Sequence, residues 1–439
     1  MRRRSFLTAA GGFPALAASL PDGRKAIGGQ APARTAGQDG DLGGMPLARL
    51  RDRYRAEFGE FLEFFDRHVV DRRYGGFLCS TDHDGSRLDT NKTASTEGRG
   101  IWCYSFMYNH GLAREDRYLD CAKRSVDLIM KRRPAAGEYW PGTYAQDGAV
   151  IDRNGSLPGD CYIAEGLAEY ARATGEKKYA AVARETLFGA LAKYDSPAFR
   201  DGASPYPGAR NLWYWMLFMW FGTNWLMNAP DPELEKVVDR SVEAMMAHHR
   251  NPDFDLWNLV VNHDLSRPSG ENAAHARLAG CGHATEATWM IMYEAVRRRD
   301  RTLFDEAARV FRRHAEVSAD AVYGGVFNDL EDVDANRWGL TKIFWAQAFI
   351  LIGSLQVVRH QGLAWARDMF TRQFEYVESR CRLERWGFPL MIDSADRRIA
   401  ALPKAVRKDI YHHPRYLMLC LEALERMAER GGRTSGVFG

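Results

Sequence analysis

Two histidines in the sequence stand at the start of apolar, helix-like segments, where side chains can serve as general acid and general base. The first is His283, in the segment 282–286 that reads GHATE. His283 and Glu286 are three residues apart, so both project from the first turn of one helix toward the same side. The positive end of the helix dipole disfavours a protonated imidazole, which leaves His283 able to accept a proton. A capping or core histidine and an ordinary first-turn glutamate are the structural alternatives.

The second histidine is His412, in the segment 411–415 that reads YHHPR. Pro414 suits the first turn of a helix. Successive residues on a helix point about 100° apart, so only one of the two adjacent histidines faces a given cavity. We assign His412 to the interior and His413 to another face. No Asp or Glu accompanies the pair at the spacing of metal ligands, so we predict no metal site.

Arg99 lies beside two aromatic residues, Trp102 and Tyr104, in the segment 97–104 that reads EGRGIWCY. A guanidinium group donates hydrogen bonds to oxygens, and aromatic rings stack on the C–H faces of sugars. This combination suits a polar, polyhydroxylated ligand. The alternative is an ion pair between Arg99 and Glu97, with the aromatic residues in the core.

A comparable group occurs in the segment 342–349, which reads KIFWAQAF. Trp345 and Gln347 offer a stacking surface and an amide, and Lys342 adds a cation at the start of the same apolar segment. Taken singly, a core tryptophan and a glutamine with internal hydrogen bonds explain these residues equally well. Together with Glu286, Trp102 and Tyr104, they are the candidate substrate-binding residues.

The segments that must position these residues alternate between two kinds. Charged, amphipathic segments are expected to form an outer layer of helices: 47–70, 115–132, 176–194, 231–250, 302–318 and 362–380. Segments that are apolar on most faces must be covered nearly all round and are expected to form an inner layer: 97–110, 159–173, 209–228, 283–298, 341–358 and 411–428. The starts of the inner segments recur at a mean spacing of about 63 residues, which fits one outer and one inner helix per repeat.

Repeated helix pairs of this kind build either an open solenoid or a closed ring. A solenoid needs polar capping repeats, but the last inner segment, 411–428, is as apolar as the middle ones. We therefore predict an all-α (α/α)6 barrel whose long connections meet at one face. The connections also repeat a motif, YGGF at 74–77, YGGV at 323–326 and WGF at 386–388, each followed by a lysine (Lys92, Lys342, Lys404). Short β-hairpins are expected there, with turns at 83–85 and 146–148.

Composition narrows the class of protein. The 439 residues are 46% hydrophobic and 27% charged, as in a protein with a large core, and the net charge of +3 argues against binding to a nucleic-acid backbone. The seven cysteines are odd in number and contain no close pair, so neither a disulfide framework nor a zinc site is predicted. The most apolar run, 212–226, is too short to span a bilayer and is expected to be a buried helix.

The N-terminus differs from the rest of the chain. Three arginines, Arg2, Arg3 and Arg4, precede Ser5-Phe6-Leu7 and a mildly apolar segment through Leu20, which resembles a twin-arginine export signal. A disordered basic start is the alternative. We therefore divide the chain into a signal and flexible tether at 1–45, a folded domain at 46–430 and a disordered tail at 431–439. Export to the periplasm or the medium is expected.

In their order and spacing, these motifs resemble the N-acylglucosamine 2-epimerase family, which includes mannose isomerases and cellobiose 2-epimerases. The resemblance covers residues 47–428, and its family fold is an (α/α)6 barrel. It rests on 74–77, Asp84-Gly85, Lys92, the 97–104 segment, Gly282-His283 with Glu286 and Trp289, Gly324-Gly325, Lys342 with Trp345 and Gln347, and 411–415.

The resemblance implies a proton transfer next to the carbonyl group of a free sugar, without metal or other cofactor. One histidine removes the C2 proton, an enediolate forms, and a histidine across the pocket returns a proton. By this resemblance His283 and His412 are the acid–base pair, Arg99 stabilises oxyanion charge, and Glu286 orients His283 or a substrate hydroxyl. The expected partner is a small sugar; the sequence does not determine the oligomeric state, and a homodimer is compatible with it.

Two departures from the family pattern bear on the substrate. The family often has WWxQxE where this chain reads FWAQAF, so an acid is replaced by Phe349. Cellobiose epimerases and mannose isomerases resemble one another in a histidine on the third inner helix, but here 211–228 has none and offers Trp213, Trp215 and Met216. This favours an N-acylglucosamine-type or unassigned sugar. The alternatives are a sugar-binding protein without activity, and a glycoside hydrolase or lyase, for which Glu286 and Asp160 are the available acids.

Overall fold

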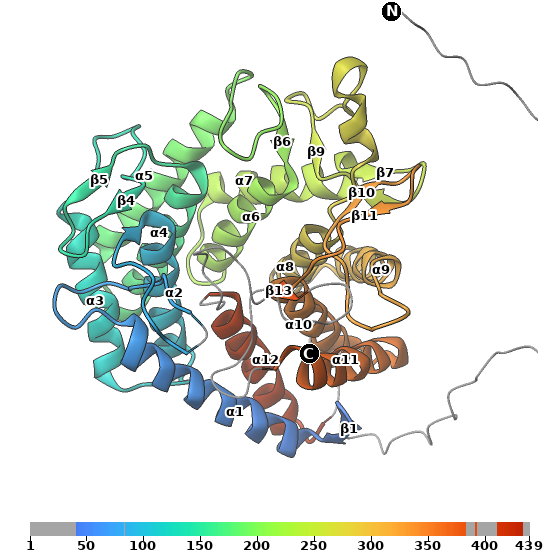
Figure 1. Cartoon of the computed structure of the whole chain (residues 1–439), viewed down its shortest axis with the longest axis horizontal. Helices are drawn as coiled ribbons and strands as arrows, with labels where there is room; N and C mark the ends of the chain where they lie inside the picture. Colours follow the sequence, from blue (N-terminus) through green and yellow to red (C-terminus); the bar gives the residue numbers. More distant parts are fainter. Residues whose placement is uncertain (1–40, 83, 383–390, 393–410, 433–439) are drawn as a thin grey trace, which may run out of the picture. The chain divides into compact units, whose positions relative to one another are not determined.

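The computed structural model describes residues 41–82, 84–382, 391–392 and 411–432 (Figure 1). The predicted export signal, most of the predicted tether, the WGF motif at 386–388, Lys404 and residues 433–439 lie outside the described residues. Strand β1 (Asp41–Leu42) pairs antiparallel with β2 (Met45–Pro46), so regular structure begins slightly before Pro46. In the described part of the chain, no helix combines the length and apolar character needed to cross a membrane.

The inner helices form where apolar residues occupy nearly every helical face. In α6, for example, Tyr214 through Thr223 are all buried, because neighbouring helices cover the helix on all sides. The inner helices are α2 (Ala94–Asn109), α4 (Leu157–Thr174), α6 (Leu212–Leu226), α8 (Cys281–Arg298), α10 (Phe344–Gln361) and α12 (His412–Glu429).

The outer helices bury one stripe and expose the rest. In α9 the buried residues Phe304, Ala307, Phe311 and Ala315 recur every three or four positions, as expected for an amphipathic helix. The outer helices are α1 (Leu47–Phe64), α3 (Asp116–Met130), α5 (Lys177–Tyr194), α7 (Pro232–Glu243), α9 (Arg301–Val317) and α11 (Ala364–Tyr376). In the described residues, α1, α7 and α11 each continue into one π-helical turn. These turns are Phe65–Val69, Ala244–His248 and Val377–Cys381, respectively.

The inner helices contact one another in chain order, from α2 through α4, α6, α8 and α10 to α12. Helix α12 also contacts α2, which closes these contacts into a ring (Figure 1). Each inner helix packs mainly against one outer helix: α12 packs against α1, and every other inner helix packs against the outer helix that follows it. The predicted (α/α)6 barrel is therefore confirmed, and an open solenoid is excluded.

Short strands occupy the connections between the helices. Strands β3, β6 and β12 lead directly into inner helices α2, α6 and α10, and the predicted 146–148 turn joins β4 to β5. The ladders are β3-β4-β5, β6-β9, β7-β8, β10-β11 and β12-β13. Their strands are β3 (Lys92–Thr93), β4 (Thr143–Tyr144), β5 (Val150–Asp152), β6 (Arg210–Asn211), β7 (Arg250–Asn251), β8 (Leu256–Trp257), β9 (Val260–Val261), β10 (Leu330–Asp332), β11 (Arg337–Trp338), β12 (Lys342–Ile343) and β13 (Met391–Ile392); Gly270–Arg277 forms a 3₁₀ segment.

The repeated glycine motif has a structural explanation. In the second copy, Gly324 and Gly325 have φ of +83° and +70°, and a Cβ on Gly325 would lie 2.9 Å from the Gln347 side-chain oxygen. Lys342 closes this turn, because its Nζ donates to the carbonyl of Gly324 at 2.7 Å and lies 2.9 Å from an Asp320 carboxylate oxygen. Lysine and glycine thus fold the connection tightly against the inner helix.

The first copy of the motif is built in the same way. Lys92 donates to Asp71 at 2.9 Å and to the carbonyl of Gly75. The position of Gln347 is taken by Glu97, whose Oε1 accepts from the backbone N–H of Phe77 at 3.0 Å. Burial raises the pKa of Glu97 to about 7, because a carboxylate is poorly solvated there.

Candidate active site

Side chains near the N-terminal ends of the inner helices meet in an unbroken chain of ring contacts. Trp213, the second residue of α6, lies 6.1 Å from the His283 ring, the third residue of α8, measured between ring centroids. On the other side of His283 lies Trp345, the second residue of α10, at 5.1 Å. His283 is thus held between two tryptophan rings and is only half-buried.

The series of side-chain contacts continues from Trp345 along the rim of the barrel. The Trp345 ring lies 6.0 Å from the ring of His412, the first residue of α12, and the His412 ring lies 5.1 Å from that of Tyr411. The Arg99 guanidinium sits 4.5 Å from the centre of the Tyr411 ring and 4.0 Å from that of Tyr162 on α4. Arg99 also donates to the Tyr162 hydroxyl at 2.7 Å. We call these seven residues the aromatic belt: Trp213, His283, Trp345, His412, Tyr411, Arg99 and Tyr162.

The belt places the three predicted catalytic residues on one rim of the barrel. Because each inner helix contributes a residue from its first two turns, their N-terminal ends share that rim, as the sequence predicts. The rings of His283 and His412 both contact the indole ring of Trp345, at 5.1 and 6.0 Å between centroids. Two basic rings and a guanidinium around aromatic surfaces form a site that can bind a sugar and move its protons.

A charged pair connects α8 with α12 one turn along from the belt. Arg415 donates to the Oε1 of Glu286, and both side chains are buried. The Arg415 guanidinium also lies 4.9 Å from the centre of the Tyr411 ring and 5.3 Å from that of Phe349. Glu286 is therefore engaged by Arg415, and it forms no hydrogen bond with His283 among the described residues.

A second acid, Glu165 on α4, is buried and close enough to sense the charge of Arg415. Its Oε1 accepts from the indole N–H of Trp220 at 2.9 Å. Burial raises the pKa of Glu165 to about 7, against the lowering effect of the positive charge on Arg415. The interior of the barrel thus carries a carboxyl group that is easily protonated near neutral pH.

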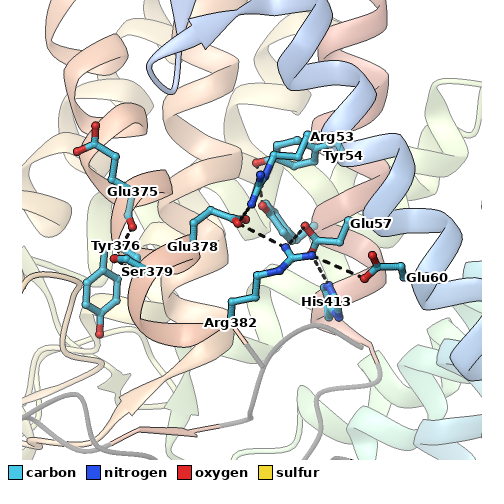
Figure 2. A network of polar contacts seen from close by, with 11 residues as sticks. Arg53, Tyr54, Glu57, Glu60, Glu375, Tyr376, Glu378, Ser379, Arg382 and His413 are labelled. Atoms are coloured by element: carbon cyan, nitrogen blue, oxygen red, sulfur yellow. Dashed lines mark hydrogen bonds and ion pairs between the residues drawn. The ribbon is translucent and has the colours of Figure 1, made fainter. Parts of the chain in front are cut away.

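His413 faces away from the belt, as the 100° separation from His412 predicts. It is buried between α12 and α1, where its Nε2 donates to the Oε1 of Glu57 at 2.9 Å (Figure 2). The other carboxylate oxygen of Glu57 accepts from Arg382 at 3.2 Å, and Arg382 also lies 3.4 Å from Glu378. This network anchors the first turn of α12, which presents His412.

Four of the predicted substrate-binding residues lie in the core instead of on the belt. Tyr104 packs against Phe77, with ring centroids 5.3 Å apart, and Trp102 stacks on the neighbouring Phe106 and meets Tyr411 at 6.0 Å. Lys342 closes the 324–325 turn described above. Gln347 binds both the N–H and the carbonyl of Val326, at 2.9 and 2.8 Å. These positions favour a role in the scaffold over direct contact with a sugar.

Sequence reasoning did not find several residues that surround the candidate catalytic groups. Tyr162 lies in an apolar helix without any recognisable motif, although it binds Arg99 directly. Asp329 lies immediately before β10 and carries no signal in the sequence, yet it is close enough for its charge to interact with that of His283. Burial raises the pKa of Asp329, while the charge on His283 acts in the opposite direction.

Comparisons with known proteins place this geometry in context. The family model for N-acylglucosamine 2-epimerase (GlcNAc 2-epimerase) matches residues 75–415. The N-acylglucosamine 2-epimerase of Rattus norvegicus is 23% identical over 407 residues, covering 87% of this chain and 93% of that protein. The cellobiose 2-epimerase of Bacillus thermoamylovorans superposes with a TM-score of 0.72 at 15% identity, over 86% of this chain and 100% of that one. A D-mannose isomerase superposes with a TM-score of 0.71 at 13% identity, over 85% of this chain and 98% of that one. The structural likenesses show a shared fold.

Proposed function

Since the chain belongs to the N-acylglucosamine 2-epimerase family and is therefore a sugar epimerase or isomerase, we propose that His283 and His412 are its acid–base pair. The observation that carries this proposal is the aromatic belt, in which both imidazoles contact Trp345 on one rim of the barrel. A sugar stacked on that indole ring presents its C–H bonds to both histidines. Arg99, held by Tyr162 and Tyr411, supplies positive charge on the same rim.

The proposed reaction begins with the open-chain form of the sugar. One imidazole takes the C2 proton while the electrons of the C2–H bond shift toward the carbonyl oxygen. This gives an enediolate from a sugar with a C2 hydroxyl and a 2-acylamino enolate from an N-acylated sugar. Arg99 stabilises the negative charge on that oxygen. Return of a proton to C2 from the opposite face completes an epimerisation, whereas delivery to C1 completes an aldose–ketose isomerisation.

The walls of the site support an N-acylated monosaccharide as the first substrate to test. Trp213 and Phe349 lie next to His283 and His412, respectively, and both are apolar. Apolar surface beside the catalytic groups suits an acyl group better than a second sugar ring with its many hydroxyls. The N-acylglucosamine 2-epimerases of Rattus norvegicus and Bos taurus also match 87% and 88% of this chain.

Hydrolysis is less well supported, because it requires two carboxyl groups facing each other across the substrate. Glu286 is bound by Arg415, and Asp160 accepts a hydrogen bond from the backbone N–H of Trp140 at 2.9 Å. Both candidate acids are buried and occupied by the scaffold.

The reaction itself is tested by incubating the protein with free sugars in D2O and following the products by NMR. N-acetylglucosamine, N-acetylmannosamine, mannose and cellobiose form the panel. We expect deuterium at C2 of an epimerised product, or at C1 of an isomerised one, because histidine protons exchange with solvent. A chelator should not inhibit, and C2-deuterated substrate should react more slowly. Product without deuterium at either carbon and without this isotope effect contradicts the mechanism, and release of a smaller sugar indicates hydrolysis.

We also propose that the protein is exported through its twin-arginine-type N-terminus. Replacing Arg3 and Arg4 by lysine should leave folded protein in the cytoplasm, because such signals depend on the arginine pair. Fractionation followed by immunoblotting measures the distribution, and Arg2→Lys, which preserves the pair, is the control. An unchanged periplasmic or secreted yield of the double variant contradicts this proposal.

A further inference from the structure

Three buried polar atoms at the start of α8 have no hydrogen-bond partner in the described part of the chain. They are the Nδ1 of His283 and one side-chain oxygen each of Asn328 and Asp329. Such atoms are costly to bury unless a function or a ligand uses them. Since the His283 side chain is only half-buried while Nδ1 is inaccessible, the Nε2 side of the ring is its accessible side.

The backbone brings Asn328 and Asp329 to this place. Ala279, just before α8, and Leu330 exchange two hydrogen bonds of 3.0 Å, and the N–H of Gly282 donates to the Asn328 carbonyl at 2.8 Å. A side chain on Gly282 would lie 2.0 Å from the Asn328 side-chain oxygen, so the glycine permits this close approach. The connection carrying Asp329 therefore lies directly against the first turn of α8.

Among the described residues, Asp329 is an acid close enough for its charge to interact with that of His283. Trp213 and Trp345, on the two sides of the ring, offer no acceptor, and Glu286 on the same helix is engaged by Arg415. The Oδ2 of Asp329 accepts from the side-chain amide of Asn328 at 2.5 Å, which holds the carboxylate while its Oδ1 has no hydrogen bond.

We propose that Asp329 is a positioning residue that accepts a hydrogen bond from the Nδ1–H of His283 and thereby directs the Nε2 lone pair at the substrate. This inference rests on the proposed function, since it concerns the same proton transfer. A carboxylate at Nδ1 fixes the tautomer of the neutral ring and stabilises the imidazolium that forms. The proton from C2 goes to Nε2, the electron pair of the C2–H bond moves to the carbonyl oxygen of the resulting enolate, and Asp329 gains no proton.

The kinetic test compares Asp329→Asn with Asp329→Glu. We expect Asp329→Asn to lower kcat for C2 exchange of N-acetylmannosamine at least about 10-fold, with KM changed less than about threefold, because the tautomer is no longer fixed. Asp329→Glu should recover part of the loss. Glu331→Gln is the matched control: it removes an acid two residues away that pairs with Arg337 and is exposed, and it should leave kcat unchanged. A loss confined to KM, or no loss, overturns the proposal.

The spectroscopic test needs no turnover. In protein with 15N-labelled histidine, the ring nitrogens of His283 are assigned by the signals that disappear in His283→Asn. We expect the wild-type ring, when neutral, to carry its proton on Nδ1, and Asp329→Asn to show a mixture of both tautomers. A wild-type ring protonated on Nε2 overturns the proposal even when the variants fail to fold, and so does an identical spectrum in Asp329→Asn.

The two tests separate this inference from the proposed function. If no sugar in the panel exchanges its C2 hydrogen, the proposed function fails, while the tautomer of His283 still decides the role of Asp329. If sugars exchange but the tautomer does not depend on Asp329, the proposed function stands and this inference fails.

Discussion

Asparagine in place of His283 or His412 should lower kcat at least about 100-fold, the usual cost of losing a general acid or base. Asparagine keeps a polar group of similar size, so the tryptophan rings beside each histidine retain a neighbour. Each variant should bind sugar but exchange the C2 hydrogen slowly. Initial rates of deuterium incorporation, with circular dichroism to confirm folding, measure the effect.

His413→Asn is the matched control for the His412 variant. His413 lies next to His412 in the sequence, but it is buried against Glu57 and takes no part in the aromatic belt. We therefore expect its replacement to lower stability and to leave most of kcat in the protein that remains folded. If His413→Asn lowers kcat strongly while His412→Asn lowers it only slightly, the catalytic histidine is His413.

The ring of helices was predictable because the two layers differ in composition. An outer helix such as α9 shows a single apolar stripe, whereas an inner helix such as α6 is apolar all round, and both features are local in the sequence. Closure followed from the apolar last segment, which became α12. Because the inner helices all run in the same direction, His283 and His412, which stand at their starts, were expected at the same end of the barrel.

The functions of single side chains were harder to predict, because residue type does not reveal the partner. Lys342 looks like a ligand-binding cation in the sequence, but Asp320 and the carbonyl of Gly324 satisfy it. On a helix that is apolar on every face, periodicity cannot tell which aromatic residue lines the bore. Tyr162, which accepts a hydrogen bond from Arg99 in the structure, therefore carries no signal in the sequence.

Long-range ion pairs were not predictable at all from local patterns. Glu57 and His413 are separated by 356 positions and meet only because the first and last helices of the ring pack together. Glu57 looks like any acid of an amphipathic outer helix, yet it is buried. Glu57, which secures the first turn of α12, thus lies in a segment whose local pattern does not indicate a buried ion pair.

Glu57→Ala should lower the free energy of unfolding by about 3 kcal/mol, because it leaves His413 buried without its carboxylate and also removes a partner of Arg382. Denaturant unfolding followed by tryptophan fluorescence measures the loss. Glu60→Gln is the matched control, since Glu60 lies one turn along α1, is about half exposed, and contacts Arg382 at 3.7 Å. As an exposed ion pair it should change stability by less than about 0.5 kcal/mol.

The pH dependence provides a second and independent check on the same pair. Burial alone would raise the pKa of Glu57, but the hydrogen bond from His413 and the charge of Arg382 outweigh it and lower the pKa below its ordinary value of 4.5. A lowered pKa means that the unfolded chain takes up a proton more readily than the folded one as the pH falls. The stabilisation by Glu57 is therefore complete above about pH 5 and is lost below pH 4.5.

The difference in unfolding free energy between wild type and Glu57→Gln should accordingly shrink as the pH falls below 4.5. Replacing both partners by leucine should cost less than the sum of the single changes, because an apolar pair suits the space beside Phe61 and Phe344. Strict additivity of the two substitutions, or a difference that grows as the pH falls, would show that Glu57 and His413 do not stabilise the fold as a pair.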